Sequence, residues 1–239
     1  MLAIAPTLAC VAPPESAPVV TAAEQPSPRA PAQAAAECSL VGAQAAYRCT
    51  EVIGYSQTRN WWGAAATPWF EGSPGIDGSR WQLRWHNGAV LEKWADPAYE
   101  GWNLGAPATH LDSPCSDATV ERVVLNLGSE VLDELSPAED WAAAIDATVA
   151  TVRSKFPALR TIVLQPIVGG TAAALCNTQA SRSHPVQVQA AALAADGAQV
   201  IAGPDLQVTS CLAFADALGH LTHEGSRRTG PKVAACYAQ

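Results

Sequence analysis

The stretch RVVLNLGSEVLDELSPAEDWAAAIDATVATVRSKFPALRTIVLQ, residues 122–165, decides the fold class. Its two ends, Arg122–Leu127 and Thr161–Gln165, are short runs rich in Val, Leu and Ile that are followed by Gly or Pro, as buried strands are. Apolar residues recur between them at helical spacing: Trp141, Ile145, Val149 and Val152. A strand, a helix and a second strand in this order predict two parallel strands joined by a helix that covers the sheet.

The same alternation continues on both sides of this stretch. Glu51–Tyr55, Arg80–His86 and Ala198–Ala202 have the composition or the alternation of strands, and residues 185–193 and 223–235 are expected to be helical. Together these patterns predict a five-stranded, mainly parallel sheet that is covered on both faces. In such sheets ligands bind beyond the carboxyl ends of the strands, so the chemistry of the chain is expected at that edge.

Composition and charge exclude several classes of function. The chain has 239 residues, of which 14 are Lys or Arg and 22 are Asp or Glu, for a net charge of −8. This acidic balance argues against a protein that binds nucleic acid through its phosphates. No apolar run reaches the roughly 20 residues of a membrane-spanning helix. The cysteines show no metal-ligand spacing, so a zinc site is not expected. No motif in the sequence implies another metal, a nucleotide or a redox cofactor.

The cysteines favour an oxidising compartment. Without Cys10 there are six, an even number that suits up to three disulfides. The sequence does not choose among the possible pairings, although Cys38 with Cys49 is the expected local pair and Cys211 with Cys236 would tie down the last helix. The alternative is a set of buried free thiols in a cytosolic protein.

The N-terminal segment resembles the end of a secretory signal. Leu8-Ala9-Cys10 is similar to a bacterial lipobox, which makes Cys10 a candidate for lipidation and a membrane tether. Ala, Pro, Ser, Glu and Gln dominate residues 11–36, a composition typical of a disordered linker. We therefore expect a linker over residues 1–36 and an ordered domain over residues 37–239, secreted or held at the cell envelope, with a plain disordered tail as the alternative.

Reactive side chains follow two of the expected strands. Ser56 comes directly after the first strand, and Asp216 and His220 lie together after the fifth strand and before the last helix. A serine hydroxyl becomes a useful nucleophile when an imidazole takes its proton, and a carboxylate holds that imidazole in the required tautomer. These three residue types therefore predict a nucleophilic serine site.

This arrangement resembles the SGNH (GDSL-like) hydrolases, most specifically at GHLTHEG, residues 219–225. The resemblance implies a three-layer α/β/α sandwich with a flavodoxin-like sheet. It also implies hydrolysis of carboxylic esters, with a small molecule, a glycan or a lipid as the acylated substrate and without a cofactor. Ser56 would be the nucleophile, His220 its general base and Asp216 the orienting carboxylate. The alternative is a catalytically impaired binding module of the cell envelope with the same fold.

The resemblance also implies an oxyanion hole, from which the sequence departs. Ser56 and Gly88 match two main-chain donors of the family. The third donor, an asparagine, is replaced by Glu130, whose ionised carboxylate cannot donate, so Ser129 is the expected substitute. The family's Gly-Asp-Ser is Gly-Tyr-Ser here, with Tyr55 in place of the aspartate.

Seven of the eight tryptophans lie between residues 61 and 102. Trp61 and Trp62 follow Ser56 closely, so at least one of them is expected to wall a substrate groove. Trp81 and Trp85, four residues apart in the second strand, are expected to cover the sheet as part of the core.

Overall fold

The computed structural model of the protein describes residues 38, 43–103, 115–133, 135–169, 176, 200–208 and 210–238. Its strands are β1 (Thr50–Gly54), β2 (Trp81–Trp85), β3 (Arg122–Asn126), β4 (Thr161–Gln165) and β5 (Val200–Ala202). They form one sheet in the order β2-β1-β3-β4-β5, and every neighbouring pair is parallel. This is the strand order of the flavodoxin-like sheet, so the predicted fold class is confirmed.

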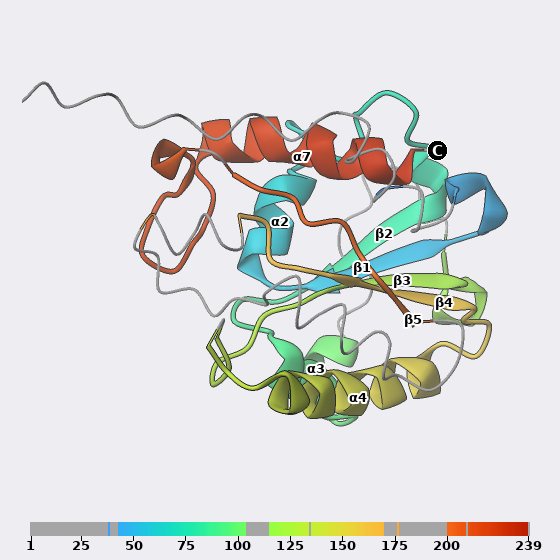
Figure 1. Ribbon diagram of the computed structural model, residues 1–239. Helices are drawn as coiled ribbons and strands as arrows, with labels where there is room; N and C mark the ends of the chain where they lie inside the picture. The colour runs from blue at the N-terminus through green and yellow to red at the C-terminus, as the bar shows by residue number, and fades with distance from the viewer. Residues whose placement is uncertain are drawn as a thin grey trace, which may run out of the picture.

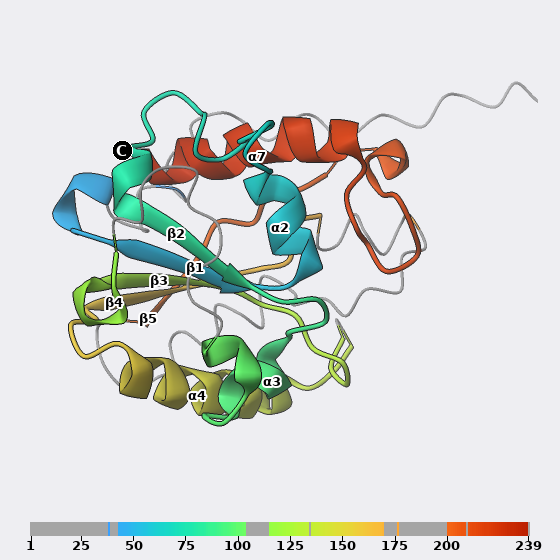
Figure 2. The same ribbon diagram turned by 180° about the vertical axis from the view of Figure 1, so that it is seen from behind.

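Helices cover the sheet on both faces (Figures 1 and 2). Helices α2 (Ser56–Trp62) and α7 (His223–Tyr237) pack together on one face, and α3 (Leu91–Ala95) and α4 (Ala138–Lys155) pack together on the other. Short 3-10 turns connect these elements: η2 (Gln44–Ala46), η3 (Gly78–Arg80), η4 (Glu100–Trp102), η5 (Asp117–Thr119) and η6 (Cys211–Ala213). None of the helices in the described part of the chain combines the length and hydropathy needed to cross a membrane.

The hydrophobic core lies in two layers, one on each side of the sheet. Successive strand residues point to opposite faces, so Val124 and Val163 enter the layer beneath α2 and α7, whereas Leu125 and Leu164 enter the layer beneath α3 and α4. Trp141 of α4 is fully buried in the second layer. Burial on both faces explains why these strands are continuous apolar runs.

Strand β2 carries polar residues that are buried rather than exposed. The Glu51 carboxylate on β1 accepts hydrogen bonds from Gln82 and Arg84 on β2. Arg84 also donates to Asp117 Oδ1 at 2.6 Å, so its charge is shared between two carboxylates. Burial raises the pKa of Glu51 despite these donors. The polar residues that alternate with apolar ones along β2 therefore belong to a buried ion-pair network.

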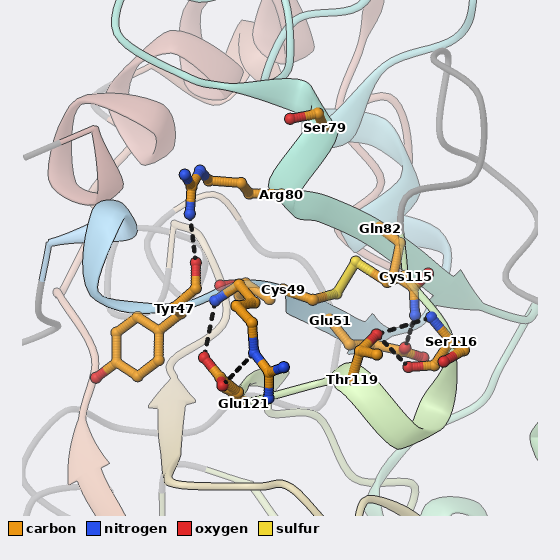
Figure 3. Close-up of a disulfide and its surroundings, with 12 residues drawn as sticks. Tyr47, Cys49, Glu51, Ser79, Arg80, Gln82, Cys115, Ser116, Thr119 and Glu121 are labelled. Carbon is orange, nitrogen blue, oxygen red and sulfur yellow. Dashed lines mark hydrogen bonds and ion pairs between the residues drawn. A yellow bond between two sulfur atoms is a disulfide. The ribbon is translucent and has the colours of Figure 1, made fainter.

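Three disulfides join segments that are far apart in the chain. They are Cys38–Cys236, Cys49–Cys115 and Cys176–Cys211, with Cα–Cα distances of 4.5, 5.9 and 5.1 Å. The Cys49–Cys115 bridge lies just before β1, among Glu51, Gln82 and Glu121, as Figure 3 shows.

The expected pairs Cys38–Cys49 and Cys211–Cys236 are wrong, although all four cysteines are bridged. The expectation rested on closeness along the chain, whereas α7 brings Cys236 against the segment that holds Cys38. The expected linker, the lipidation candidate Cys10 and the helix expected over residues 185–193 lie outside the described residues.

Candidate active site

Ser56, His220 and Asp216 come together at the carboxyl edge of the sheet. Ser56 is the first residue of α2, directly after β1, and its Oγ lies 2.6 Å from His220 Nε2. The other ring nitrogen, Nδ1 of His220, lies 2.6 Å from Asp216 Oδ2. The side chains of His220 and Asp216 are 31% and 42% exposed, so a solute can reach them. The three side chains that the sequence analysis singles out together are thus joined by two short contacts.

The site lies where the order of the sheet reverses. Strand β1 has β2 on one side and β3 on the other, so the chain leaves β1 at the point where neighbouring connections run to opposite faces. In this class of sheet the crevice at that point binds ligands. Ser56 lies at this point of the sheet because it is the first residue of α2, the helix that follows β1.

Asp216 also shapes the loop that carries the histidine. Its Oδ1 accepts hydrogen bonds from the main-chain N–H groups of Leu218 at 2.9 Å and His220 at 3.2 Å. Burial opposes ionisation of Asp216, but hydrogen bonds from the ring and main chain of His220 outweigh it and hold the pKa below its ordinary value. Gly219 completes the turn with φ of +82°, a conformation that favours glycine. Asp216 therefore stays ionised and holds the imidazole in place.

Two side chains of α2 clamp the histidine loop on either side of His220. Gln57 Nε2 donates to the Gly219 carbonyl at 3.2 Å, and Asn60 Oδ1 accepts from Leu221 N–H at 3.0 Å. Gln57 is buried and also exchanges two hydrogen bonds with the main chain of Val168 beyond β4. Sequence reasoning missed both residues because a polar side chain on a short helix carries no sign of a partner more than 100 residues away.

Tyr55, which stands where the hydrolases that the sequence resembles have an aspartate, is buried between β1 and Ser56. Its buried side chain packs with Val90 and Ile167, from the segments that follow β2 and β4. A Cβ added to Gly128 would lie 2.8 Å from the Tyr55 ring, so the glycine leaves the room that the ring needs. The Tyr55 hydroxyl donates to the main-chain carbonyl of Leu127 at 3.4 Å, so the side chain also joins the segment after β1 to the segment after β3.

The two expected main-chain donors lie beyond neighbouring strand ends. Gly54 of β1 pairs with Trp85 of β2, so Ser56 and Gly88 follow those strands by two and three residues. As the first residue of a helix, Ser56 has an N–H without an intrahelical acceptor. Gly88 has φ of +63°, which lets the backbone turn there without strain.

The expectation that Ser129 is the third donor is wrong. The Ser129 hydroxyl donates its single proton to the Glu92 carboxylate, and its oxygen accepts from the main-chain N–H groups of Val131 and Leu132 at 3.1 and 2.8 Å. It is buried and shapes the turn after β3. Glu130 next to it forms an ion pair with Lys93, whose Nζ lies 3.3 Å from Glu130 Oε1.

The tryptophans are distributed differently from the expectation. Trp61 and Trp62 are both fully buried in the core, where Trp62 stacks on Phe70 and Trp61 meets the Phe70 ring edge to face, so neither walls the site. They face inward because α2 buries that side against α7 and the sheet. Trp81 belongs to the core as expected, whereas Trp85 is only half-buried and borders a surface groove.

No three His, Cys, Asp or Glu side chains are grouped as metal ligands among the residues that the structure describes. No protein-family model matches the sequence, and a search of curated proteins finds no similar sequence.

Several solved structures resemble the chain at a distance. A protein from Arabidopsis thaliana matches 66% of this chain and 58% of its own, with 16% identity and a TM-score of 0.39. A family two carbohydrate esterase from Cellvibrio japonicus matches 79% of this chain and 60% of its own, with 13% identity and a TM-score of 0.47. A Streptococcus pneumoniae protein described provisionally as a platelet activating factor matches 85% of this chain and 94% of its own, with 16% identity and a TM-score of 0.46. The chain thus spans less than two thirds of the first two structures, and these likenesses are too distant to assign a family.

Proposed function

We propose that the chain is a serine hydrolase of the SGNH type that cleaves carboxylic esters. The observation that carries the proposal is the pair of 2.6 Å contacts that join Ser56 to His220 and His220 to Asp216. An N-cap serine needs no imidazole beside its hydroxyl, and a histidine that only packs needs no carboxylate on its far nitrogen. This chain of contacts is the arrangement that activates a serine.

The reaction begins with attack by Ser56 Oγ on the carbonyl carbon of the ester. His220 Nε2 takes the hydroxyl proton as the new C–O bond forms, and the charge on the carbonyl oxygen is met by the N–H groups of Ser56 and Gly88. The tetrahedral intermediate then expels the alcohol, which receives the proton from His220, and leaves an acyl group on Ser56.

Water completes the cycle. His220 Nε2 takes a proton from a water molecule, whose oxygen bonds to the acyl carbon, and the proton then passes to Ser56 Oγ as the acyl–serine bond breaks. The products are a carboxylic acid and the regenerated serine, so atoms and protons balance. Asp216 stays ionised throughout and keeps Nε2 free to accept protons.

We also place this enzyme outside the cytoplasm, secreted or at the cell envelope. The three disulfides support this location because disulfides persist in oxidising compartments. The acylated substrate, a small molecule, a glycan or a lipid, would be met there.

The test is covalent labelling with a fluorophosphonate, followed by mass spectrometry of the labelled peptide. We expect the label on Ser56, and we expect Ser56→Ala and His220→Ala to lose it while hydrolysis of 4-nitrophenyl acetate falls by about 10⁴-fold or more. Ser154→Ala, which removes a hydroxyl on α4 away from the site, should label like the unmodified protein. A folded, disulfide-bonded sample that takes no label and cleaves no activated ester would leave the impaired binding module as the better account.

A further inference from the structure

An open groove of about 430 Å³ is lined by Arg59 of α2, three residues after Ser56, and by Leu221, the residue after His220. The residues that line it and carry the argument are Arg59, Asn60, Trp69, Trp85, Leu221 and His223. None of them has a role in the ester cleavage described above, apart from the clamp that Asn60 makes with Leu221.

Several residues of the groove are close neighbours of Ser56 and His220 in the fold. Arg59 and Asn60 follow Ser56 by three and four residues on α2, so the three side chains share one face of that helix, with neighbouring Cβ atoms about 5–6 Å apart. Leu221 also lines the groove, directly follows His220 and donates its main-chain N–H to Asn60 Oδ1 at 3.0 Å. Trp85 is the last residue of β2 and pairs with Gly54, two residues before Ser56. A molecule whose ester carbonyl lies at Ser56 can therefore extend along this wall of α2.

Arg59 lacks a carboxylate partner among the residues that the structure describes. Its guanidinium lies 5.8 Å from the centre of the Trp85 ring, and within the described part of the chain it makes neither an ion pair nor a side-chain hydrogen bond. By contrast, Arg84 and Arg227 are both bonded to carboxylates. Burial lowers the pKa of Arg59, and no acidic group in the described ranges offsets that effect.

Partial burial removes some of the hydration of a cation, and an anion beside it offsets that loss. The protein carries a net charge of −8, so acidic side chains are abundant, yet none of those described is placed at Arg59. The planar guanidinium matches a carboxylate through two parallel hydrogen bonds.

We infer that Arg59 and the groove around it bind a carboxylate on the ester substrate, so that this hydrolase prefers acid-bearing esters over neutral ones. The inference rests on the proposed function, because it takes Ser56 as the place where the ester carbonyl lies. The carboxylate belongs to the acyl part or to the alcohol part of the ester, and the experiment separates the two.

The experiment compares matched esters by kcat/KM. On the alcohol side the pair is 4-acetoxybenzoate and its methyl ester, and on the acyl side it is the mono-4-nitrophenyl ester of glutarate and 4-nitrophenyl pentanoate. We expect the acidic member of one pair to be preferred, and we expect Arg59→Gln to lower that preference by about 10- to 100-fold, through a higher KM. Arg59→Lys should restore part of it because the charge is kept.

Arg160→Gln is the matched control. It removes the same charge from an exposed arginine next to the amino end of β4, at the opposite edge of the sheet, and should leave the preference unchanged. Equal kcat/KM values within both pairs, or a preference that survives Arg59→Gln, would overturn the inference while ester cleavage itself still stands.

A binding measurement covers the case in which no ester is cleaved. In ¹⁵N-labelled Ser56→Ala protein, 4-acetoxybenzoate should shift the indole N–H signal of Trp85, assigned by Trp85→Phe, more than the methyl ester does. Adding Arg59→Gln should abolish the difference. If no ester is cleaved but the Arg59-dependent shift is seen, the proposed hydrolase activity is refuted and the carboxylate site at Arg59 stands. Equal shifts from both compounds would refute the carboxylate site.

Discussion

Gln57 and Gly219 are joined by a hydrogen bond of 3.2 Å across 162 residues of chain. Gln57 is the residue after the proposed nucleophile and Gly219 is the residue before the proposed base, so this contact fixes the separation of Ser56 and His220. Asn60 and Leu221 repeat the arrangement on the other side of His220. Ser56 and His220 are thus held together by side chains that take no part in the proposed ester cleavage.

Loss of the clamp should slow the site more than it destabilises the protein. We expect Gln57→Leu to lower the fluorophosphonate labelling rate by about 10- to 100-fold, because small displacements of reacting groups carry costs of this size. Gln165→Leu is the control, since Gln165 is also a buried glutamine bonded to a loop carbonyl, that of Pro204, but does not contact the histidine loop. Equal labelling rates in the two variants at matched stability would show that Gln57 has only a structural role.

The carboxylate of Asp216 should increase activity by holding His220 in the tautomer that leaves Nε2 free to accept a proton. Asp216→Asn offers an amide in place of a charged acceptor and should lower kcat by about 10²- to 10⁴-fold. Asp146→Asn, on the exposed side of α4, removes the same charge and should have little effect. Because the pKa of Asp216 lies below its ordinary value of 3.8, its ionisation should not limit activity between pH 5 and 8. An unchanged kcat in the Asp216→Asn variant would remove Asp216 from the mechanism.

Glu130 should depress activity through its charge. Its partner Lys93 has Nζ 3.5 Å from the position of a Cβ added to Gly88, so the ion pair lies next to a proposed oxyanion donor. We expect Glu130→Asn to raise kcat and Lys93→Met to lower it, each by up to about fivefold, since exposed ion pairs are worth up to about 1 kcal/mol. Both effects should shrink in concentrated salt. Unchanged kcat in both variants would place the pair outside the oxyanion site.

Glu121 should stabilise the fold in a pH-dependent way. The main-chain N–H of Arg48 donates to its carboxylate at 2.8 Å and the Arg48 side chain pairs with it, so the pKa of Glu121 lies below its ordinary value of 4.5. A lowered pKa in the folded state means that the contribution is present above the unfolded pKa and is lost as the pH falls through the folded pKa. Glu121→Gln should therefore lower the free energy of unfolding at pH 7 by about 1 kcal/mol, and urea titrations should show the difference vanish in acid. If the difference in the free energy of unfolding persists in acid, the effect of Glu121→Gln comes from packing and not from the charge of Glu121.

The Cys49–Cys115 bridge should contribute to stability without affecting the site. It closes a 66-residue separation next to β1, and the Cys49 carbonyl accepts from the N–H groups of Glu121 and Arg122. Cys49→Ala with Cys115→Ala should lower the free energy of unfolding by about 2–4 kcal/mol. Fluorophosphonate labelling of the folded double variant should proceed at the unmodified rate, because the bridge lies at the amino edge of the sheet and the triad at the carboxyl edge. Slower labelling at full folding would show that the two edges are coupled.

The order of residues along the chain was enough to predict the sheet and to single out the three side chains that meet at its carboxyl edge. The strand predicted over Thr161–Gln165 has the bounds found in the structure, because residues buried on both faces leave an unbroken apolar run. Ser56 was recognisable because it closely follows the first strand, and Asp216 and His220 because they lie together between the fifth strand and the last helix, on the side of a parallel sheet where functional groups collect.

The folded molecule alone shows which cysteines pair and which cation lies in the groove. It also shows what surrounds Trp61, Trp62 and Ser129. Cys38 pairs with Cys236 because α7 packs back over the sheet, which no local pattern reveals. The clamp by Gln57 and the uncompensated burial of Arg59 likewise depend on what the distant chain brings to α2. Periodicity reports which face of an element is buried, whereas the partner on that face is set by the packing of the whole chain.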